Sequence, residues 1–402
     1  MADQSRGLVA SPKKRLALFL DGTWNTVNDN TNVWRLKSLC ASRSTDGLAQ
    51  AVYYSAGVGT QFGDKFRGGM FGYGLNDEII AAYEWLIDKY NDGDELFLFG
   101  FSRGAYTARS LSGFIAKCGL LIAGAPLSVN QLYARYRRGS APQTIRELLA
   151  AREQGKTDFS IEEEWMMKYS LPIDVEFIGV WDTVGALGLP FGDLPLFGRS
   201  DMQFLNTGLR VPNKFAFQAL AIDEHREAFA PTLWTVDRST APNHTNPPPR
   251  PLDQVEQRWF VGAHANVRGG YQSDLLAQLP LKWMMQKAID HGLSFRRSVD
   301  LDGNPEISPV CDSYAEFMYG AYKLATFDHP YYREIGQDAA PSGTQTVRAT
   351  INETMDGSVF DRWRADDTYR PPNLTRWAQR YSVDPAILSY AVRADDPATA
   401  VP

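Results

Sequence analysis

ELFLFGFSRGAYTARSL, residues 95–111, joins an almost continuous apolar run to a segment with helical spacing. The apolar run predicts a buried strand, and the spacing that starts at Ala105 predicts a helix. Gly100 to Gly104 form a G-x-S-x-G nucleophile-elbow motif, which is informative when a strand precedes it and a helix follows it. The two glycines permit a sharp turn that exposes the Ser102 hydroxyl, and N–H groups at the helix start can stabilise an oxyanion. A serine that only caps the helix is the plainer alternative.

The same alternation of apolar runs and amphipathic segments extends through the chain. Four further apolar runs predict buried strands, at residues 15–20, 51–55, 173–182 and 256–263. Two amphipathic segments predict helices, at residues 76–90 and 274–292. Strands that alternate with helices imply an α/β fold, in which a mostly parallel sheet is flanked by helices on both faces.

Composition narrows the classes of protein. The chain has 402 residues, of which 44% are apolar and 22% charged, so it can bury a sizeable core. Its net charge of −6 includes no long basic block, which excludes the electrostatic footprint of a nucleic-acid binder. The three cysteines form no C-x-x-C pair, which argues against a disulfide framework or a thiolate zinc site.

The sequence carries no clear targeting signal. No run reaches the ~20 apolar residues that a membrane helix needs. The basic start of the chain leads into an apolar run that is too short for a signal peptide and lacks a cleavage site. We therefore expect synthesis in the cytoplasm, and any export without an N-terminal signal.

Two strand ends could supply partners for the serine. A serine hydroxyl becomes nucleophilic when a histidine accepts its proton and a carboxylate orients that histidine. His264 directly follows an apolar run and enters a glycine-containing loop, and Asp182 likewise ends an apolar run. Both would lie at the carboxyl edge of the sheet, where open α/β folds build their sites. The order Ser102, Asp182, His264 is that of the α/β-hydrolases, with a turn aspartate and a structural histidine as the plainer alternatives.

The other histidines lie in contexts that favour the catalytic role less. Four of them occupy charged, proline-rich or helix-end segments: His225, His244, His291 and His329. If Asp182 were not the acid, Asp223 and Asp193 would be the next candidates.

Six blocks of sequence together resemble one known family. They occupy residues 20–25, 100–115, 179–188, 219–234, 259–271 and 369–374, beginning with LDGTWN and ending with YRPPNL. Their joint occurrence resembles the DUF2235 family, the α/β-hydrolase group that includes the type VI secretion phospholipase effectors of the Tle1 class. In the loop after His264, Asn266 and Arg268 replace the Asp and the first Gly of the usual family pattern.

The resemblance implies an activity and a site. It implies a serine hydrolase that cleaves carboxylic esters, lipid or phospholipid esters in the first place, through Ser102, Asp182 and His264, with no metal and no cofactor. It also implies peripheral membrane contact and a secretion-apparatus or immunity protein as partner. A housekeeping hydrolase of soluble esters, and a hydrolase-fold interaction module with little turnover, are the alternatives.

The segment FLDGTWN raises a rival interpretation. It resembles the D-x-D-G-T entry of aspartate-nucleophile phosphatases, but Phe19 stands where the attacking aspartate would be, so that reading fails. We instead expect Gly22 and Thr23 to supply an oxyanion-hole N–H and Arg103 to supply the second. Asp21 would shape this turn, and whether it also contacts substrate is open.

The pattern divides the chain into three parts. We expect an N-terminal tail at residues 1–12, an α/β-hydrolase catalytic domain at 13–292 and a C-terminal extension at 293–402 that packs on it. Residues 125–172 are amphipathic and predict a helical insertion within the catalytic domain.

The helical insertion could act as a lid or as a docking surface. Its residues Trp165, Met166 and Met167 offer an apolar surface for contact with a membrane. Packing of the same side chains in the core is at least as consistent with the sequence.

Overall fold

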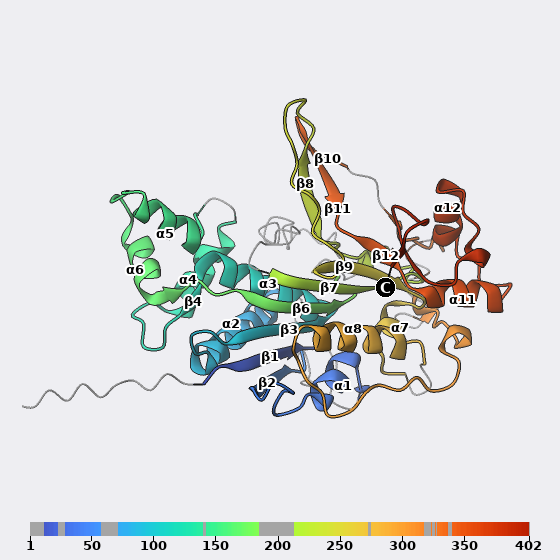
Figure 1. Cartoon of the computed structure of the whole chain (residues 1–402), viewed down its shortest axis with the longest axis horizontal. Helices are drawn as coiled ribbons and strands as arrows, with labels where there is room; N and C mark the ends of the chain where they lie inside the picture. Colours follow the sequence, from blue (N-terminus) through green and yellow to red (C-terminus); the bar gives the residue numbers. More distant parts are fainter. Residues whose placement is uncertain are drawn as a thin grey trace, which may run out of the picture.

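A nine-stranded sheet forms the centre of the computed structural model, in the order β14-β13-β12-β9-β7-β6-β3-β1-β2 (Figure 1). The structure describes residues 12–22, 29–57, 71–139, 142–184, 213–271, 275–316, 323, 326, 328–336 and 340–401.

Seven neighbouring strands of this sheet run parallel to one another: β1 (Lys14–Leu20), β2 (Ala49–Ser55), β3 (Glu95–Phe101), β6 (Val175–Trp181), β7 (Asn213–Ala221), β9 (Val255–Phe260) and β12 (Glu353–Met355). Two short antiparallel strands follow at one edge, β13 (Ala391–Arg393) and β14 (Ala400–Val401). The predicted fold class, a mostly parallel α/β-hydrolase-like sheet flanked by helices, is confirmed.

The central strands read as continuous apolar runs because both of their faces are buried. Successive side chains of a strand point to opposite sides of the sheet. In β1, Leu16 and Leu18 belong to one apolar cluster, whereas Ala17 and Phe19 belong to the other. Each strand therefore joins two helical layers.

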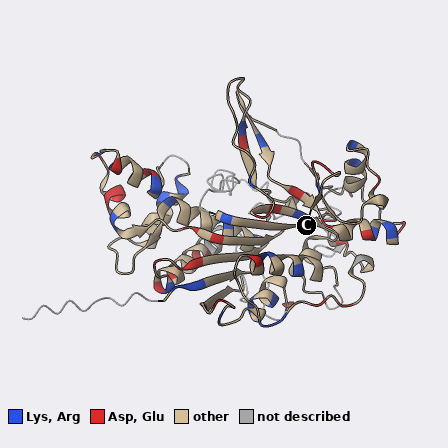
Figure 2. Ribbon diagram, in the orientation of Figure 1, with Lys and Arg blue, Asp and Glu red and all other residues tan. Residues whose placement is uncertain are grey.

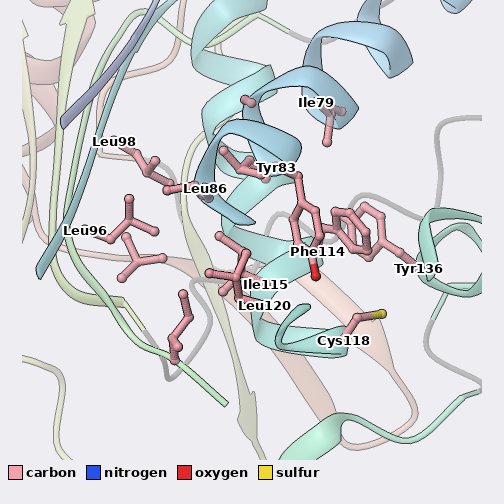
Figure 3. Packing of buried hydrophobic residues seen from close by; sticks show 14 of the residues in the cluster. Ile79, Tyr83, Leu86, Leu96, Leu98, Phe114, Ile115, Cys118, Leu120 and Tyr136 are labelled. Carbon is pink, nitrogen blue, oxygen red and sulfur yellow. The ribbon is translucent and has the colours of Figure 1, made fainter. Parts of the chain in front are cut away.

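Helices cover both sides of the sheet. On one side lie α2 (Phe71–Lys89) and α3 (Arg103–Cys118), and on the other α1 (Asn32–Leu39) and α8 (Gln278–Asp290). Figure 3 shows the first layer, where side chains of β3 face those of α2 and α3. There the rings of Tyr83 and Phe114 stack with centroids 4.3 Å apart. This packing fixes the position of α3, and with it the turn that precedes the helix.

The predicted insertion folds as three short helices joined by a two-stranded ribbon: α4 (Val129–Arg137), α5 (Ile145–Glu153), α6 (Ile161–Tyr169), β4 (Leu120–Leu121) and β5 (Ser170–Leu171). Each helix begins with a capping box. The side chain of the N-cap residue accepts the backbone N–H three residues later, and the side chain of that later residue accepts the N-cap backbone N–H. The insertion follows the carboxyl end of α3, and the 16 residues of that helix span roughly 24 Å. In Figure 1 it lies at the opposite end of the sheet from α7 (His264–Arg268). It therefore does not cover Ser102 as a lid.

The surface of the insertion is mixed in charge. Met166 and Met167 are buried in the core, and Trp165 is 41% exposed. Acidic and basic residues both occur in the insertion (Figure 2), and the side chain of Arg138 pairs with that of Glu162. Of the three residues expected to form an apolar docking surface, the two methionines instead pack against the core.

The C-terminal part contributes to the central sheet and also forms a separate one. Strands β12, β13 and β14 extend the central sheet beyond β9, so the sheet itself continues across the predicted boundary at residue 292. A second, three-stranded sheet projects from the body of the molecule (Figure 1), and consists of β8 (Thr235–Ser239), β10 (Ala340–Gly343) and β11 (Thr346–Thr350). The predicted domain division stays a prediction.

Helices α11 (Gly357–Ala365) and α12 (Pro372–Arg380) pack on the C-terminal strands and form a third apolar cluster with Trp259 of β9. The described residues also form four single turns: α9 (Ser313–Glu316), η3 (Glu227–Phe229), η4 (Pro305–Ile307) and η6 (Pro385–Ile387). Among the described residues, no helix combines the length and apolarity that crossing a membrane requires.

Candidate active site

Ser102 occupies a strained turn between β3 and α3. Its φ of 55° and ψ of −118° lie in a region that residues with a side chain rarely adopt. The Ser102 N–H donates to Trp181 O at 3.0 Å, and its carbonyl accepts from Tyr106 N–H at 3.1 Å. The neighbouring strand and the first helical turn therefore hold the strained backbone in place. Such strain often marks a functional position.

The glycines on either side of Ser102 are required by close packing. A Cβ atom at Gly100 would collide with the backbone of Gly104. A Cβ atom at Gly104 would collide with the carbonyl oxygens of Leu20 and Asp21 at the end of β1. Glycine at both positions thus lets α3 start directly against the neighbouring strand, which is the geometry that a G-x-S-x-G turn needs.

The structure brings Ser102, Asp182 and His264 together from the carboxyl ends of three strands. His264 Nε2 lies 3.0 Å from Ser102 Oγ, and His264 Nδ1 lies 2.5 Å from Asp182 Oδ2. The three residues are at most 8% exposed. Nδ1 bears the proton in the tautomer that matches these contacts, because the Asp182 carboxylate can only accept a hydrogen bond. Nε2 is then left to accept a proton from the serine.

The Asp182 carboxylate is held by several donors. Its Oδ1 atom accepts the Ala221 N–H at 3.1 Å and the Arg333 Nη1–H at 2.6 Å, and its Oδ2 atom accepts Arg333 Nη2–H at 2.9 Å. Burial by itself would raise the pKa of Asp182, but the Arg333 cation and the His264 hydrogen bond outweigh it and hold the pKa well below its usual range. Asp182 therefore stays ionised in the folded protein.

The His264 ring is enclosed by aromatic side chains. Its centroid lies 4.5 Å from that of Phe101 and 5.1 Å from that of Phe229. Burial lowers the pKa of His264, and although the Asp182 hydrogen bond acts in the opposite direction, the pKa stays below the ordinary value of a histidine. The imidazole is consequently neutral at neutral pH, as a proton acceptor must be.

A second buried ion pair flanks the histidine. Glu224 Oε2 accepts the His264 backbone N–H at 3.2 Å and the Ser313 hydroxyl at 2.9 Å. The Arg226 guanidinium donates to both carboxylate oxygens of Glu224, at 2.7 and 2.8 Å. Burial would raise the pKa of Glu224, but Arg226 lowers it to about 2. This pair anchors the start of the short helix that carries His264.

Sequence reasoning missed both Glu224 and Arg333. Glu224 stands just after the apolar run of β7, and the strand-end argument used for Asp182 would have found it. Arg333 lies in the segment YYREIG, which shows neither a strand pattern nor a helical one. Its contact with Asp182 spans 151 residues of sequence, and no local pattern indicates it.

The expected oxyanion donors differ in their placement. Arg103 is the first residue of α3, so its N–H lies at the helix start next to Ser102. The Gly22 N–H donates to Asp21 Oδ1 at 2.8 Å, which differs from the expectation that it faces the nucleophile. Thr23 lies outside the described residues. The turn after β1 therefore satisfies its Gly22 amide internally in this structure.

Asp21 has a role in shaping this turn. Besides the Gly22 N–H, its carboxylate accepts the Tyr54 hydroxyl at 3.1 Å and the Thr31 hydroxyl. Thr31 is also the N-cap of α1. Asp21 is 1% exposed, so its side chain ties the end of β1 to the neighbouring strand and helix.

Of the two alternative acids, Asp223 makes its hydrogen bonds within the described structure to groups other than the His264 ring. Asp223 Oδ2 accepts the Gly262 N–H at 2.8 Å and the Tyr369 hydroxyl at 3.0 Å, which ties β7 to the loop before the histidine. Burial raises the pKa of Asp223. Asp193 lies outside the described residues.

The four other histidines lie elsewhere. His225 Nδ1 is 3.2 Å from Tyr331 O, and the His291 ring stacks on Phe215 at 3.6 Å. His244 and His329 are exposed. Within the part of the chain that the structure describes, no three His, Cys, Asp or Glu side chains are grouped as a metal site would need.

Comparison with known proteins places the chain among several relatives. Residues 14–287 match the family model "T6SS, Phospholipase effector Tle1-like, catalytic domain". The uncharacterized protein YEL023C of Saccharomyces cerevisiae is 28% identical over 200 residues, which are 45% of this chain and 28% of that protein. This chain thus matches well under half of the yeast protein.

Three solved structures show further similarity. An uncharacterized protein from Pseudomonas aeruginosa has a TM-score of 0.40 and 18% identity, with 71% of this chain and 47% of that chain covered. The Tle1 effector bound to the VgrG spike of the type 6 secretion system has a TM-score of 0.35 and 18% identity, with coverages of 65% and 52%. A putative carboxylesterase from Lactobacillus plantarum has a TM-score of 0.31 and 14% identity, with coverages of 72% and 91%.

The family model spans most of the chain, including β1, the Ser102 turn, Asp182 and His264. The resemblance seen in the six sequence blocks is thereby confirmed. The chain belongs to the family of type VI secretion phospholipase effectors of the Tle1-like type, whose catalytic domain it carries at residues 14–287.

Proposed function

We propose that this protein is a serine hydrolase that cleaves carboxylic esters, with lipid or phospholipid esters as its substrate class. The observation that carries the proposal is the chain of contacts from Ser102 Oγ to His264 Nε2 at 3.0 Å and from His264 Nδ1 to Asp182 Oδ2 at 2.5 Å. This is the arrangement that makes a serine nucleophilic. Membership of the Tle1-like phospholipase family supports lipid esters over soluble ones.

Acylation is the first half of the proposed reaction. Ser102 Oγ attacks the ester carbonyl carbon while His264 Nε2 accepts the hydroxyl proton. N–H groups at the start of α3, among them that of Arg103, stabilise the negative oxygen of the tetrahedral intermediate. As the intermediate collapses, the C–O bond to the alcohol breaks and His264 donates its proton to the departing oxygen. The acyl group remains on Ser102.

Deacylation repeats these steps with water. His264 Nε2 accepts a proton from a water molecule, whose oxygen attacks the acyl carbon. The bond to Ser102 Oγ breaks, His264 returns the proton to that oxygen, and the carboxylic acid leaves. Asp182 stays ionised throughout and stabilises the imidazolium that forms in each half.

Family membership also supports a partner and a route to the substrate. The family description is that of type VI secretion effectors, so we propose a component of a secretion apparatus as partner. Delivery by that apparatus would bring the protein from the cytoplasm to a lipid surface. Contact with the membrane would then be peripheral.

The test compares substrates and one matched pair of variants. Purified protein is incubated with short-chain esters, long-chain esters and phospholipid vesicles, and the products are identified by mass spectrometry. We expect fatty acid and lysophospholipid from the vesicles, and covalent labelling of Ser102 by a fluorophosphonate.

The control is Ser110→Ala, which changes a buried serine within α3, the helix that follows Ser102. Ser102→Ala should abolish both turnover and labelling, whereas Ser110→Ala should retain them. A folded Ser102→Ala variant that still hydrolyses esters would overturn the assignment of the nucleophile. Turnover of soluble esters alone would favour a housekeeping esterase, and absence of any turnover would favour an interaction module.

A further inference from the structure

Arg333 is completely buried and forms a salt bridge with the carboxylate of Asp182. Its side chain is 0% exposed. Nη1 donates to Asp182 Oδ1 at 2.6 Å and Nη2 donates to Oδ2 at 2.9 Å. This bidentate contact fixes both the plane and the position of the carboxylate. Arg333 lies beyond residues 14–287, to which the family model extends.

The guanidinium is itself fixed by the scaffold. Nη1 also donates to the carbonyl oxygen of Ala221 at 2.7 Å, and Nη2 to that of Phe229 at 2.6 Å. Ala221 ends β7 and Phe229 ends η3. Arg333 therefore links Asp182 to β7 and to η3. These elements are distinct from β3 and β9, which precede Ser102 and His264. A lysine could carry the charge but could not make these four contacts at once.

We propose that Arg333 is a positioning residue for the ester hydrolysis, acting through Asp182. It holds the carboxylate so that Oδ2 meets His264 Nδ1, and its charge balances that of Asp182, whose side chain is fully buried. The inference rests on the proposed function, because it presupposes that His264 is the base. It gives the C-terminal segment, for which the sequence predicts only an extension packed on the domain, a role in positioning the triad.

The balance of charge around His264 follows from four buried groups. Asp182 at the end of β6 faces Nδ1, and Glu224 after β7 faces the His264 backbone. Arg333 neutralises the first carboxylate and Arg226 the second. With two cations against two anions, there is no excess of negative charge to favour a protonated imidazole. The pKa of His264 therefore stays below its ordinary value, with burial as the main cause.

Removal of the Arg333 charge should shift the protonation equilibrium of His264 toward the imidazolium. Without Arg333, the negative charge of Asp182 acts on His264 uncompensated, so the imidazolium is favoured and the pKa of His264 rises. Because only the neutral imidazole accepts the serine proton, the acidic limb of the kcat/KM profile moves to higher pH. A purely structural role for Arg333 would lower the amount of folded enzyme and leave that limb in place.

The experiment measures kcat, KM and the pH profile of ester hydrolysis in Arg333→Gln and Arg333→Lys. For Arg333→Gln we expect kcat to fall on the order of 10- to 100-fold with KM little changed, and the acidic limb to move to higher pH. Arg333→Lys should lose less kcat and keep the limb at its original position. The matched control is Arg258→Gln, which breaks another buried arginine–carboxylate pair, that with Glu256 on β9, and should leave the limb unmoved.

A double-mutant cycle keeps the inference testable if Arg333→Gln folds poorly, since a buried carboxylate without its partner destabilises a protein. Asp182→Asn with Arg333→Gln removes both charges together. If Arg333 acts through Asp182, the double variant should be no less active than Asp182→Asn alone. A further loss in the double variant equal to that in Arg333→Gln would overturn the inference.

Ser102→Ala distinguishes a failure of the proposed function from a failure of the role of Arg333. An active Ser102→Ala variant would refute the proposed function itself. An inactive Ser102→Ala variant, together with a folded Arg333→Gln variant that keeps both its kcat and its acidic limb, would refute the role of Arg333 alone.

Discussion

Asp182 and His264 are 82 residues apart in sequence, yet His264 Nδ1 lies 2.5 Å from Asp182 Oδ2. Each stands just after a parallel strand, and the strands β6 and β9 are separated in the sheet by β7 alone. Asp182 directly follows the end of β6 and adopts a φ of 41°, in the left-handed region that residues with a side chain rarely occupy. The backbone geometry that ends β6 is therefore part of what directs the carboxylate to the histidine.

Asp182→Asn should lower kcat by on the order of 10⁴ while the fold is retained. An amide can donate to Nδ1 and so favours the tautomer whose proton is on Nε2, which cannot accept the serine proton. The measurement is steady-state turnover, with circular dichroism as the check on folding. Asp223→Asn is the companion variant, since Asp223 contacts Gly262 and Tyr369 instead of the imidazole. A large loss in Asp223→Asn and none in Asp182→Asn would reverse the assignment of the acid.

Gly104→Ala should destabilise the protein by about 1–3 kcal/mol or prevent folding, because the added Cβ collides with the Leu20 and Asp21 carbonyl oxygens. Chemical denaturation measures the free energy of unfolding. Gly357→Ala is the matched control, because its Cβ would meet Tyr390 and Ala391 backbone atoms only at 3.4 Å or more, an ordinary contact. Equal stability of Gly104→Ala and Gly357→Ala would contradict the close packing of α3 against β1.

The pH dependence of kcat/KM should show an acidic limb below the ordinary histidine pKa of 6.5, because burial lowers the pKa of His264. The rate rises as the base loses its proton, so a lowered pKa moves the rising limb to lower pH. Hydrolysis of a soluble ester between pH 4 and 8, with stability checked at each pH, measures the limb. A limb above pH 6.5 in the unmodified enzyme would contradict the lowering of the His264 pKa by burial.

Met166→Ala should reduce the free energy of unfolding by about 2–5 kcal/mol, because Met166 is fully buried and its loss leaves a cavity. Trp165→Ala should cost less stability, since its side chain is 41% exposed. Thermal denaturation of the two variants compares them, and vesicle binding of Trp165→Ala tests the surface directly. If the unmodified protein binds vesicles and Trp165→Ala does not, the insertion would be supported as a membrane-docking surface.

Local patterns in the sequence were sufficient to predict the class of fold and the three principal site residues as candidates. A buried parallel strand is a run of apolar residues, and the end of such a run marks the carboxyl edge of the sheet. Ser102, Asp182 and His264 each stand at the carboxyl end of such a run. Because parallel strands end at the same edge of the sheet, the three residues are expected to lie at one edge. The amphipathic character of residues 125–172 likewise predicted short helices.

Contacts between distant segments required the tertiary structure. Arg333 meets Asp182 across 151 residues, from a segment without any periodic pattern, so only the packed chain brings the two charges together. The insertion lies away from Ser102 because α3 leads the chain from Ser102 to the far end of the sheet. The amphipathic pattern of the insertion predicts its helices but not their position relative to Ser102. The Gly22 amide is satisfied by the neighbouring Asp21 side chain, a choice that depends on local geometry. Sequence thus determined which residues reach the edge of the sheet, whereas burial and long-range hydrogen bonding decided which of them act on one another.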